Sequence, residues 1–398
     1  MRILLLMDPF IRVPPEHYGG IERVIADLAD GLVARGHDVT LWAAPESRSR
    51  ARLEAFGREG EWTRWSNLRN TVVVTGRFWR HHGRFDLVHN FGRLAYLTGI
   101  IRSAVPKVQT YMRPVNPRNM RKVRALGAHR LRFTAVSAAI RDTGAVGGGE
   151  WSVIYNCARV ADFTPRLDTD ATTSPLVFLG RLERCKGAHT AIRVARRLGR
   201  PLVIAGNIST LSHEREYYER EVAPQVDGER VRYDGVVNTA RKNALLGSAA
   251  ALLLPVEWEE PFPVVLPEAL LCGTPVVAFS RGGIPEGIDE GRTGFLCTNE
   301  DEMVAAVRRL PEISRATCRA EAVRRFSDDA VVSDYERLYQ EVINGPVPEA
   351  ESCARGRGRG DEGRMRKAVG TPMMRVGVPG SPARVFQRDG VAVGPREK

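Results

Sequence analysis

The chain has 398 residues, of which 43% are hydrophobic and 27% charged, and its formal net charge is +12. This composition indicates a soluble globular protein, and the length favours two domains over a single core. The apolar run at residues 3–7 is too short for a signal peptide or a membrane span, and the six cysteines form no C-x-x-C pair. A disulfide framework and a zinc site are therefore not expected, and a cytoplasmic location is.

Strands and helices alternate through the first 165 residues. A loop that ends in Gly19-Gly20 precedes a helix expected over residues 21–36, which has one apolar face. Strands are expected at residues 2–7, 37–43, 71–74, 85–90, 107–111 and 133–137. This alternation predicts a parallel sheet, so residues 1–165 are expected to form an N-terminal domain.

A polar segment over residues 157–175 is typical of an inter-domain linker. A second alternating series follows, with strands expected at residues 176–180, 201–206, 231–235, 250–255 and 275–279. Residues 166–325 are therefore expected to form a second domain. The predicted fold is α/β, with two Rossmann-like doubly wound domains facing across a cleft, and ligands bind such sheets beyond the carboxyl ends of the strands.

The alternation stops after residue 344. Residues 326–344 are expected to form a C-terminal helix that packs back toward the first domain. Residues 345–398 are a basic, Gly- and Pro-rich tail in which residues 346–398 hold 11 Lys or Arg against 6 Asp or Glu. Few bulky apolar side chains occur there, which predicts disorder. The tail lacks interleaved aromatics for base stacking, so nucleic-acid binding, the function that a charge of +12 alone would suggest, is not expected.

Two loops at predicted strand ends suit a phosphate. Glycine at Gly19-Gly20 allows close backbone approach at a helix start with free N–H groups, although a plain tight turn explains the same residues. Arg181 follows the strand at 176–180, and Lys186 stands five residues further on, before a helix. Two cations at the mouth of a doubly wound sheet suit a diphosphate, whereas a solvated surface is the commoner place for single cations.

The stretch EWEEPFPVVLPEAL, residues 257–270, places two glutamates eight positions apart behind a buried strand. Glu260 lies in the loop after the strand, and Glu268 lies about one turn into a helix expected to end at Gly273. Carboxylates at such places accept hydrogen bonds from the vicinal hydroxyls of a ribose or sugar ring, so the pair suits two polyols that flank a phosphate. The alternative is that Glu260 caps the helix and Glu268 is a solvated helix residue.

His89 lies near the end of the predicted strand at 85–90. Its position favours a function, whereas a lone histidine is more often structural. No Ser-His-Asp or Cys-His pattern stands out, and the acidic and histidine residues do not cluster as metal ligands. The G-x-G-x-x-G spacing of nicotinamide-binding proteins is also absent.

Four segments together resemble the glycosyltransferase family 4 of nucleotide-sugar transferases, which have the two-domain GT-B fold. HYGGIERV is similar to the family's N-terminal glycine loop, and VIYNCARVADF resembles its inter-domain segment. GRLERCKG resembles its diphosphate Arg/Lys motif, and EEPFPVVLPEALLCGTPVVA its E-x7-E donor motif. The resemblance covers about residues 1–343, and the shared order and spacing of the motifs make it specific.

This resemblance implies a retaining glycosyltransferase of the hexosyltransferase kind that needs neither a metal nor another cofactor. It implies that Arg181 and Lys186 neutralise the donor diphosphate and stabilise the leaving nucleoside diphosphate. It assigns the ribose hydroxyls to Glu268 and the donor-sugar hydroxyls to Glu260. Catalytic positions fall on Glu260 and His89.

The resemblance also assigns two backbone segments to the donor. The Gly19-Gly20 loop would close against the β-phosphate and the acceptor, and the cleft would exclude water once the donor is bound. Pro263 stands where the family usually has glycine and has no N–H, which leaves the backbone of Phe262 and Val264 to bind the phosphate. Because proline fits only the first helical turn, we expect the helix that contains Glu268 to start near Val264 or Val265.

The implied substrates are a UDP- or GDP-sugar donor and a glycan or lipid-linked acceptor, as in polysaccharide biosynthesis, with the acceptor on the first domain. Residues 87–141 hold 11 Lys or Arg and no acidic residue. This stretch suits peripheral attachment to an anionic membrane at its inner face, and a merely solvated basic face is the alternative. A related GT-B nucleotide-sugar 2-epimerase and a non-catalytic nucleotide-sugar-binding protein also stay open as functions.

Overall fold

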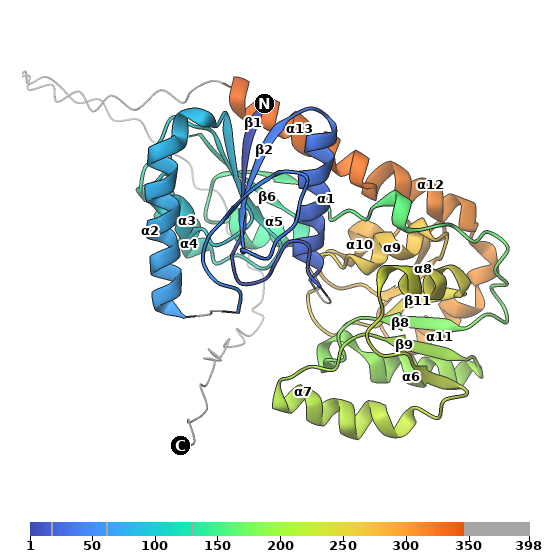
Figure 1. The fold of residues 1–398 in the computed structure, drawn as a ribbon. Coiled ribbons are helices and arrows are strands. Elements are labelled where there is room, and N and C mark those ends of the chain that lie inside the picture. The colour runs from blue at the N-terminus through green and yellow to red at the C-terminus, as the bar shows by residue number, and fades with distance from the viewer. Residues whose placement is uncertain (17–18, 61–62, 129, 346–398) are drawn as a thin grey trace, which may run out of the picture. The chain divides into compact units, whose positions relative to one another are not determined.

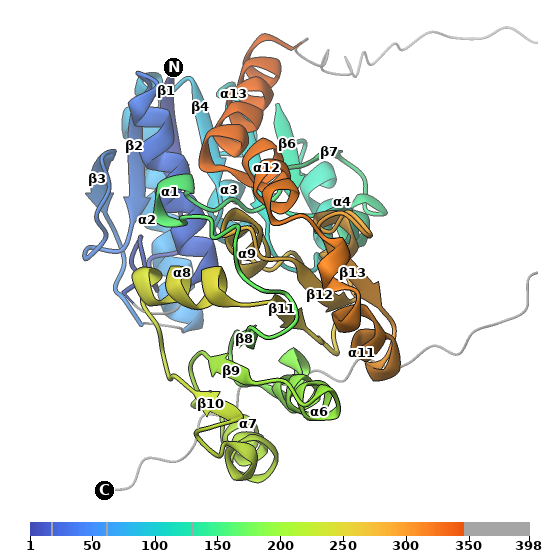
Figure 2. The ribbon, with the colours of Figure 1, turned by 90° about the vertical axis from the view of Figure 1, so that its right-hand side faces the viewer.

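A computed structural model describes residues 1–16, 19–60, 63–128 and 130–345. The described residues belong to one unit, Met1–Pro348, and the tail predicted to be disordered lies outside the described residues from residue 346 onward. This unit contains two parallel sheets with helices packed on them (Figure 1, Figure 2). We call these sheets, with their helices, the first and the second lobe.

The first sheet has seven strands in the order β3-β2-β1-β4-β5-β6-β7, and each neighbouring pair is parallel. Its strands are β1 (Arg2–Leu6), β2 (Asp38–Ala43), β3 (Arg52–Ala55), β4 (Leu87–Asn90), β5 (Lys107–Tyr111), β6 (Leu131–Ala135) and β7 (Glu150–Val153). Its connecting helices are α1 (Gly20–Ala34), α2 (Arg64–His81), α3 (Ala95–Thr98), α4 (Pro117–Ala125) and α5 (Ala138–Ala145), with a 3-10 turn at His82–Arg84.

The central strand β1 is buried on both faces, so its side chains alternate between two apolar layers. Ile3 and Leu5 pack in the layer that contains α1, and Leu4 and Leu6 pack in the layer that contains α2 and α3. The last helix, α13 (Asp328–Asn344), adds its apolar side to the α1 layer and lies against α1 (Figure 1). Helix α13 thus completes the apolar layer that β1 and α1 form at the start of the chain.

The strand predicted at residues 71–74 is wrong, because these residues lie inside α2. The helix starts with a capping box between Thr63 and Ser66. Its buried side chains recur every four residues, at Ser66, Asn70, Val74 and Phe78. The run of β-branched residues suggested a strand, but the helical period of the buried positions determines the structure. Val72 and Val73 consequently lie on the solvent side of α2.

The second sheet has six parallel strands in the order β10-β9-β8-β11-β12-β13. Its strands are β8 (Leu176–Leu179), β9 (Leu202–Ala205), β10 (Val231–Tyr233), β11 (Ala251–Leu254), β12 (Val276–Phe279) and β13 (Gly294–Cys297). Its helices are α6 (Ala188–Leu198), α7 (Ser212–Tyr217), α8 (Thr239–Ser248), α9 (Val265–Leu271), α10 (Ile284–Gly287), α11 (Glu300–Arg308) and α12 (Arg315–Phe326). Shorter turns lie at Val160–Asp162, Arg184–Lys186, Tyr218–Val222, Ala223–Gln225 and Leu310–Glu312.

In both sheets the strand order runs outward from one strand and then reverses, which is the doubly wound arrangement. The predicted α/β fold with two Rossmann-like halves is therefore confirmed. The reversal falls between β1 and β4 in the first sheet and between β8 and β11 in the second. Ligands bind doubly wound sheets at such reversals.

The chain crosses between the lobes twice, and the two crossings pair with each other. The Ala158 N–H donates to the Phe326 carbonyl at 3.0 Å, and the Asp328 N–H donates to the Ala158 carbonyl at 3.2 Å. The Asp328 carboxylate also accepts the Val160 N–H at 3.1 Å. Among the described helices, none is both long and apolar enough to cross a membrane.

Candidate active site

The candidate site lies at the carboxyl ends of β8 and β11, which are neighbours in the second sheet. Because the strand order reverses between them, the loops that follow diverge and leave space for a ligand. Arg181 stands in the loop after β8, and Glu260 stands in the loop after β11. The two predicted motifs therefore meet at one switch point.

Glu260 is held by two donors. Its Oε2 accepts from Lys186 Nζ at 2.5 Å and from Trp258 Nε1 at 2.6 Å. The Lys186 Nζ also lies 4.8 Å from the centroid of the Trp258 ring. The side chains of Lys186 and Glu260 are only 13% and 8% exposed, so water and salt screen this ion pair weakly. The sequence predicted Lys186 and Glu260 as site residues from two separate motifs, and no pattern in it pointed to Trp258.

Gly187 allows these two loops to pack together. Its φ of 78° lies in the left-handed region, and a Cβ there would come within 2.0 Å of the Pro255 carbonyl oxygen. Glycine is the residue that adopts this conformation without penalty. The loop that carries Lys186 consequently rests on the end of β11.

The positive charges of Arg181 and Lys186 both interact with the Glu183 carboxylate. Arg181 Nη1 donates to Glu183 Oε1 at 2.5 Å. Burial raises the pKa of Glu183, and the charges of Arg181 and Lys186 oppose that rise. The two cations predicted to bind a diphosphate thus share one electrostatic neighbourhood.

Glu268 is buried, at 3% exposure, and pairs with Lys242 of α8. Helix α9 begins at Val265, as expected, and Pro267 therefore falls in the first turn, where its missing N–H leaves no helical bond unmade. No side chain caps α9. The alternative in which Glu260 caps this helix and Glu268 is solvated is therefore wrong. Nothing in the motif pointed to Lys242.

The residues after Glu260 contact the other lobe. The Phe262 ring lies 5.0 Å from that of Tyr155, and the Phe262 carbonyl accepts from Asn156 Nδ2 at 2.8 Å. A Cβ on Gly20 would lie 3.1 Å from Val264 Cγ2. The start of α1, the linker and the donor motif thus converge.

The Gly19-Gly20 loop holds the Glu22 carboxylate at the start of α1. Helix α1 begins at Gly20, and a Cβ on Gly19 would come within 2.7 Å of both Glu22 Oε2 and Pro15 Cβ. Glycine at position 19 therefore lets Glu22 fold over the helix start. Burial raises the pKa of Glu22. Residues 17–18 of the predicted motif lie outside the described residues.

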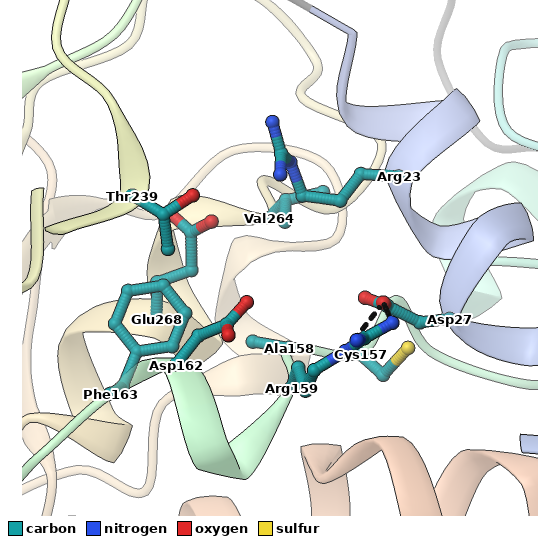
Figure 3. A pocket seen from close by; sticks show the side chains of 10 residues that line it. All are labelled: Arg23, Asp27, Cys157, Ala158, Arg159, Asp162, Phe163, Thr239, Val264 and Glu268. Carbon is teal, nitrogen blue, oxygen red and sulfur yellow. Dashed lines mark hydrogen bonds and ion pairs between the residues drawn. The ribbon is translucent and has the colours of Figure 1, made fainter. Parts of the chain in front are cut away.

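A pocket beside Glu268 joins α1, the linker and the second lobe (Figure 3). Its lining consists of Arg23, Asp27, Cys157, Ala158, Arg159, Asp162, Phe163, Thr239, Val264 and Glu268. Arg159 binds Asp27 Oδ1 through Nε at 3.0 Å and through Nη2 at 2.5 Å. Burial raises the pKa of Asp27 to about 6, although the Arg159 charge opposes the rise. In Figure 3, Thr239 lies beside Glu268 and Arg23 reaches in from α1.

His89 is not brought to this pocket. The side chain is fully buried, and its Nδ1 and Nε2 each lie 2.6 Å from a hydroxyl, that of Tyr339 on α13 and that of Thr110 respectively. The Phe91 ring covers it at 3.9 Å between centroids. Burial lowers the pKa of His89, which keeps the ring neutral. Both nitrogens are thus engaged by the fold, which argues for a structural role.

Within the described ranges, no three His, Cys, Asp or Glu side chains gather as metal ligands would.

Two family models match the chain. Glycosyltransferase Family 4 matches residues 18–160, and Glycosyl transferases group 1 matches residues 173–312. The boundary between them falls in the linker between the two sheets.

Two proteins with similar sequences are a glycogen synthase and an inositol phosphate glycosyltransferase. The glycogen synthase of Mycobacterium tuberculosis is 28% identical over 82% of this chain and 90% of that protein. A D-inositol 3-phosphate glycosyltransferase of Pseudarthrobacter chlorophenolicus is 28% identical over 54% of this chain and 59% of that protein.

Among solved structures, AviGT4, a glycosyltransferase involved in avilamycin A biosynthesis, superposes with a TM-score of 0.63 at 28% identity, covering 87% of this chain and 99% of that one. The sucrose-phosphate synthase of Thermosynechococcus elongatus superposes with a TM-score of 0.70 at 18% identity, covering 87% and 100%. The chain therefore belongs to the family 4, group 1 glycosyltransferases and has the GT-B fold.

Proposed function

We propose that this protein is a retaining glycosyltransferase that moves a sugar from a UDP- or GDP-sugar to a glycan or lipid-linked acceptor. The observation that carries the proposal is the Lys186–Glu260 pair at the switch point of the second sheet, inside the group 1 region. A cation and a carboxylate that satisfy each other there can exchange that contact for a ligand that is both anionic and rich in hydroxyls.

A nucleotide-sugar has these properties. Its diphosphate would take the charges of Lys186 and Arg181, and the sugar hydroxyls would then donate to the freed Glu260. Because a buried carboxylate left without partners is costly, the anionic and hydroxyl groups of the ligand must arrive together. This requirement favours a glycosyl diphosphate over a phosphate or a sugar alone.

The nucleoside would lie toward Glu268. Its carboxylate, held by Lys242, would accept the ribose hydroxyls, and the backbone N–H groups of Phe262 and Val264 would meet the phosphates. Gly20 lies against Val264, so the start of α1 would meet the same phosphates. The cations would stabilise the nucleoside diphosphate as the sugar departs.

The relative named glycogen synthase supports a glycan as acceptor. The acceptor would enter from the first lobe, whose basic residues 87–141 suit anionic acceptors or an anionic membrane at the inner face of a cell. Cytoplasmic location, with peripheral attachment to the membrane, follows from this proposal.

The first test is a panel of nucleotide-sugars in a thermal-shift assay, because a ligand that binds the folded state raises Tm, and a tighter ligand raises it further at the same concentration. The stabilising donor is then used in a turnover assay with Lys186→Ala, Glu268→Ala and, as a control, Glu229→Ala, which alters an exposed glutamate of the second lobe. The first two variants should stay folded, lose the donor-dependent Tm shift and lose turnover by at least about a hundredfold. Full turnover in either variant would overturn the site assignment.

A further inference from the structure

Glu257 joins the two loops that carry the Lys186–Glu260 pair. The Glu257 N–H donates to the Cys185 carbonyl at 2.8 Å. The Glu257 carboxylate accepts from His189 Nε2 at 3.0 Å. The backbone and the side chain of Glu257 thus bind the chain on either side of Lys186. Because Glu257 also stands shortly before Glu260 in its own loop, its position affects both members of the pair.

His189 is buried in the first turn of α6, and Tyr217 of α7 determines which of its ring nitrogens carries a proton. The His189 N–H, which has no partner within the helix at this position, donates to the Tyr217 oxygen at 3.3 Å. The same oxygen lies 2.8 Å from His189 Nδ1. Burial raises the pKa of Tyr217 to about 12, so the hydroxyl keeps its proton and donates it to Nδ1. In a neutral ring the imidazole proton is then on Nε2, which donates it to Glu257.

The surroundings of His189 keep its ring neutral and fixed. The side chain is 7% exposed, and burial lowers the pKa of His189, although the charge of Glu257 opposes that fall. Helix α7 lies beside α6 (Figure 1, Figure 2), and the Tyr217 ring meets the imidazole edge to face, with 5.4 Å between the centroids. A ring with one nitrogen that accepts and one that donates has a single orientation here. Its Nε2–H therefore stays directed at Glu257.

Tyr217 also contacts the other end of the turn that carries Lys186. The Arg184 guanidinium lies 4.9 Å from the centroid of the Tyr217 ring, which is within the range of a cation–π contact. The Arg184 N–H donates to Glu214 Oε2 of α7 at 2.7 Å. Helix α7 thus holds the chain before Lys186 through Arg184 and the chain after it through His189.

We propose that His189 is a positioning residue for sugar transfer, which fixes the two loops of the donor site by holding Glu257. The role rests on the proposed function, since it concerns the donor. The Glu257 side chain is 41% exposed, and water would solvate its carboxylate without a partner, so the bond to His189 contributes more to order than to stability. Order is what a site needs, because groups displaced by about 1 Å can lose about a hundredfold in rate.

The test is the donor KM of two amide variants at position 189. His189→Gln places an amide N–H where Nε2–H was, so it keeps the bond to Glu257. His189→Asn reaches only as far as Nδ1, so it keeps the bond to Tyr217 and loses the bond to Glu257. We expect the donor KM of His189→Gln to stay near wild type and that of His189→Asn to rise about tenfold. A purely structural loss would reduce the folded fraction, which lowers turnover and leaves KM unchanged.

A double-variant cycle tests whether His189 acts through Glu257. Glu257→Ala removes the same bond from the other loop, so its donor KM should rise as in His189→Asn. The variant His189→Asn/Glu257→Ala should show no further rise, because both changes break one interaction. The control is His213→Asn, which alters a 72% exposed histidine of α7 and should keep the wild-type KM. Equal KM values in His189→Gln and His189→Asn, or single effects that multiply in the double variant, overturn the proposal.

Imidazole ¹⁵N NMR of the unliganded protein provides a readout without activity. The resonances missing in His189→Gln identify the ring. They should show a neutral imidazole with its proton on Nε2 at neutral pH, and Glu257→Ala should shift the Nε2 resonance. A charged ring, or a proton on Nδ1, overturns the proposal. A wild type that uses no donor on the panel refutes the proposed function and this role together, whereas an active wild type with unaltered variants refutes the role alone.

Discussion

At the scale of single residues, the Lys186–Glu260 pair is expected to stabilise the fold, in addition to its proposed role in binding the substrate. Lys186→Met leaves the buried Glu260 carboxylate with the Trp258 N–H as a donor but without its cation, and breaking such a pair costs about 3–5 kcal/mol of unfolding free energy. The double variant Lys186→Met/Glu260→Gln removes both charges and should recover most of that loss. Urea unfolding of Lys186→Met, Glu260→Gln and the double variant measures the coupling energy between the two side chains.

The control for this cycle is Arg309→Met. Arg309 and Glu312 pair at 2.8 Å on the surface, and each side chain is 54% exposed. Its unfolding midpoint should hardly change, because exposed pairs are screened by water. If Lys186→Met behaves like Arg309→Met, the site pair is effectively solvated and the exchange with a donor loses its physical basis.

Sequence spacing could identify residues that a motif fixes relative to its own strand and helix, as it did for Arg181, Lys186, Glu260 and Glu268. Their partners could not be predicted in this way. Trp258 is two residues from Glu260, but nothing in a lone tryptophan marks its N–H as a donor to that carboxylate. Lys242, Glu22 and Arg159 reach the site from other elements, and their contacts depend on which loops the fold brings together.

His89 illustrates the same limit. Its place near the end of β4 was predictable, yet the hydroxyl that engages its Nδ1 belongs to Tyr339, 250 residues later. Burial by a distant helix leaves no local pattern in the sequence. The end of a predicted strand therefore indicates where His89 lies along the sheet, but it does not indicate which residues bury its side chain.

At the scale of elements, two glycines offer a matched pair. Gly187 and Gly199 flank α6, and both have left-handed φ, 78° and 64°. A Cβ at Gly199 would meet nothing within 4 Å, whereas one at Gly187 would meet the Pro255 carbonyl at 2.0 Å. Gly199→Ala should cost about 1–2 kcal/mol, the strain of the left-handed conformation alone. Gly187→Ala should cost clearly more and also weaken donor binding.

The measurement is urea unfolding of both variants and the Tm shift that the donor produces. Equal destabilisation of the two variants would mean that the loop before α6 moves away from β11 at little cost. In that case Lys186 would not be held against Glu260 by Gly187.

The elements that sequence predicted well are the buried ones. Central strands such as β9 (LVIA) and β11 (ALLL) are continuous apolar runs with sharp ends, because both of their faces are covered. The strands that were missed, β3 (RLEA), β7 (EWSV) and β13, lie at the sheet edges, and the first two are polar. An edge strand needs only one neighbour and carries a weaker pattern.

At the scale of the whole molecule, Glu286 of α10 ties the two lobes. Its carboxylate oxygens accept the N–H groups of Ala138 and Ala139, at 2.8 and 3.1 Å, at the start of α5. Glu286→Ala should therefore increase amide hydrogen exchange at Ala138 and Ala139 by about tenfold, since one lost hydrogen bond contributes about 1–1.5 kcal/mol. Hydrogen–deuterium exchange with peptide mapping checks this.

Glu290→Ala is the control, because that glutamate accepts the Leu296 N–H within the second lobe alone. It should leave exchange in α5 unchanged. If Glu286→Ala also leaves it unchanged, Ser137 and the packing around α5 hold the helix start without help from the second lobe.

The position of α13 has a consequence for synthesis on the ribosome. The second sheet is complete once β13 has emerged, at Cys297, but the α1 layer of the first sheet stays open until Val331, Tyr335, Tyr339 and their neighbours arrive. The lobe that is translated first is therefore the lobe that finishes last. During that interval its uncovered apolar face is a surface for chaperones to shield, and a nascent chain that stalls before α13 would be a target for quality control even though its second lobe has already folded.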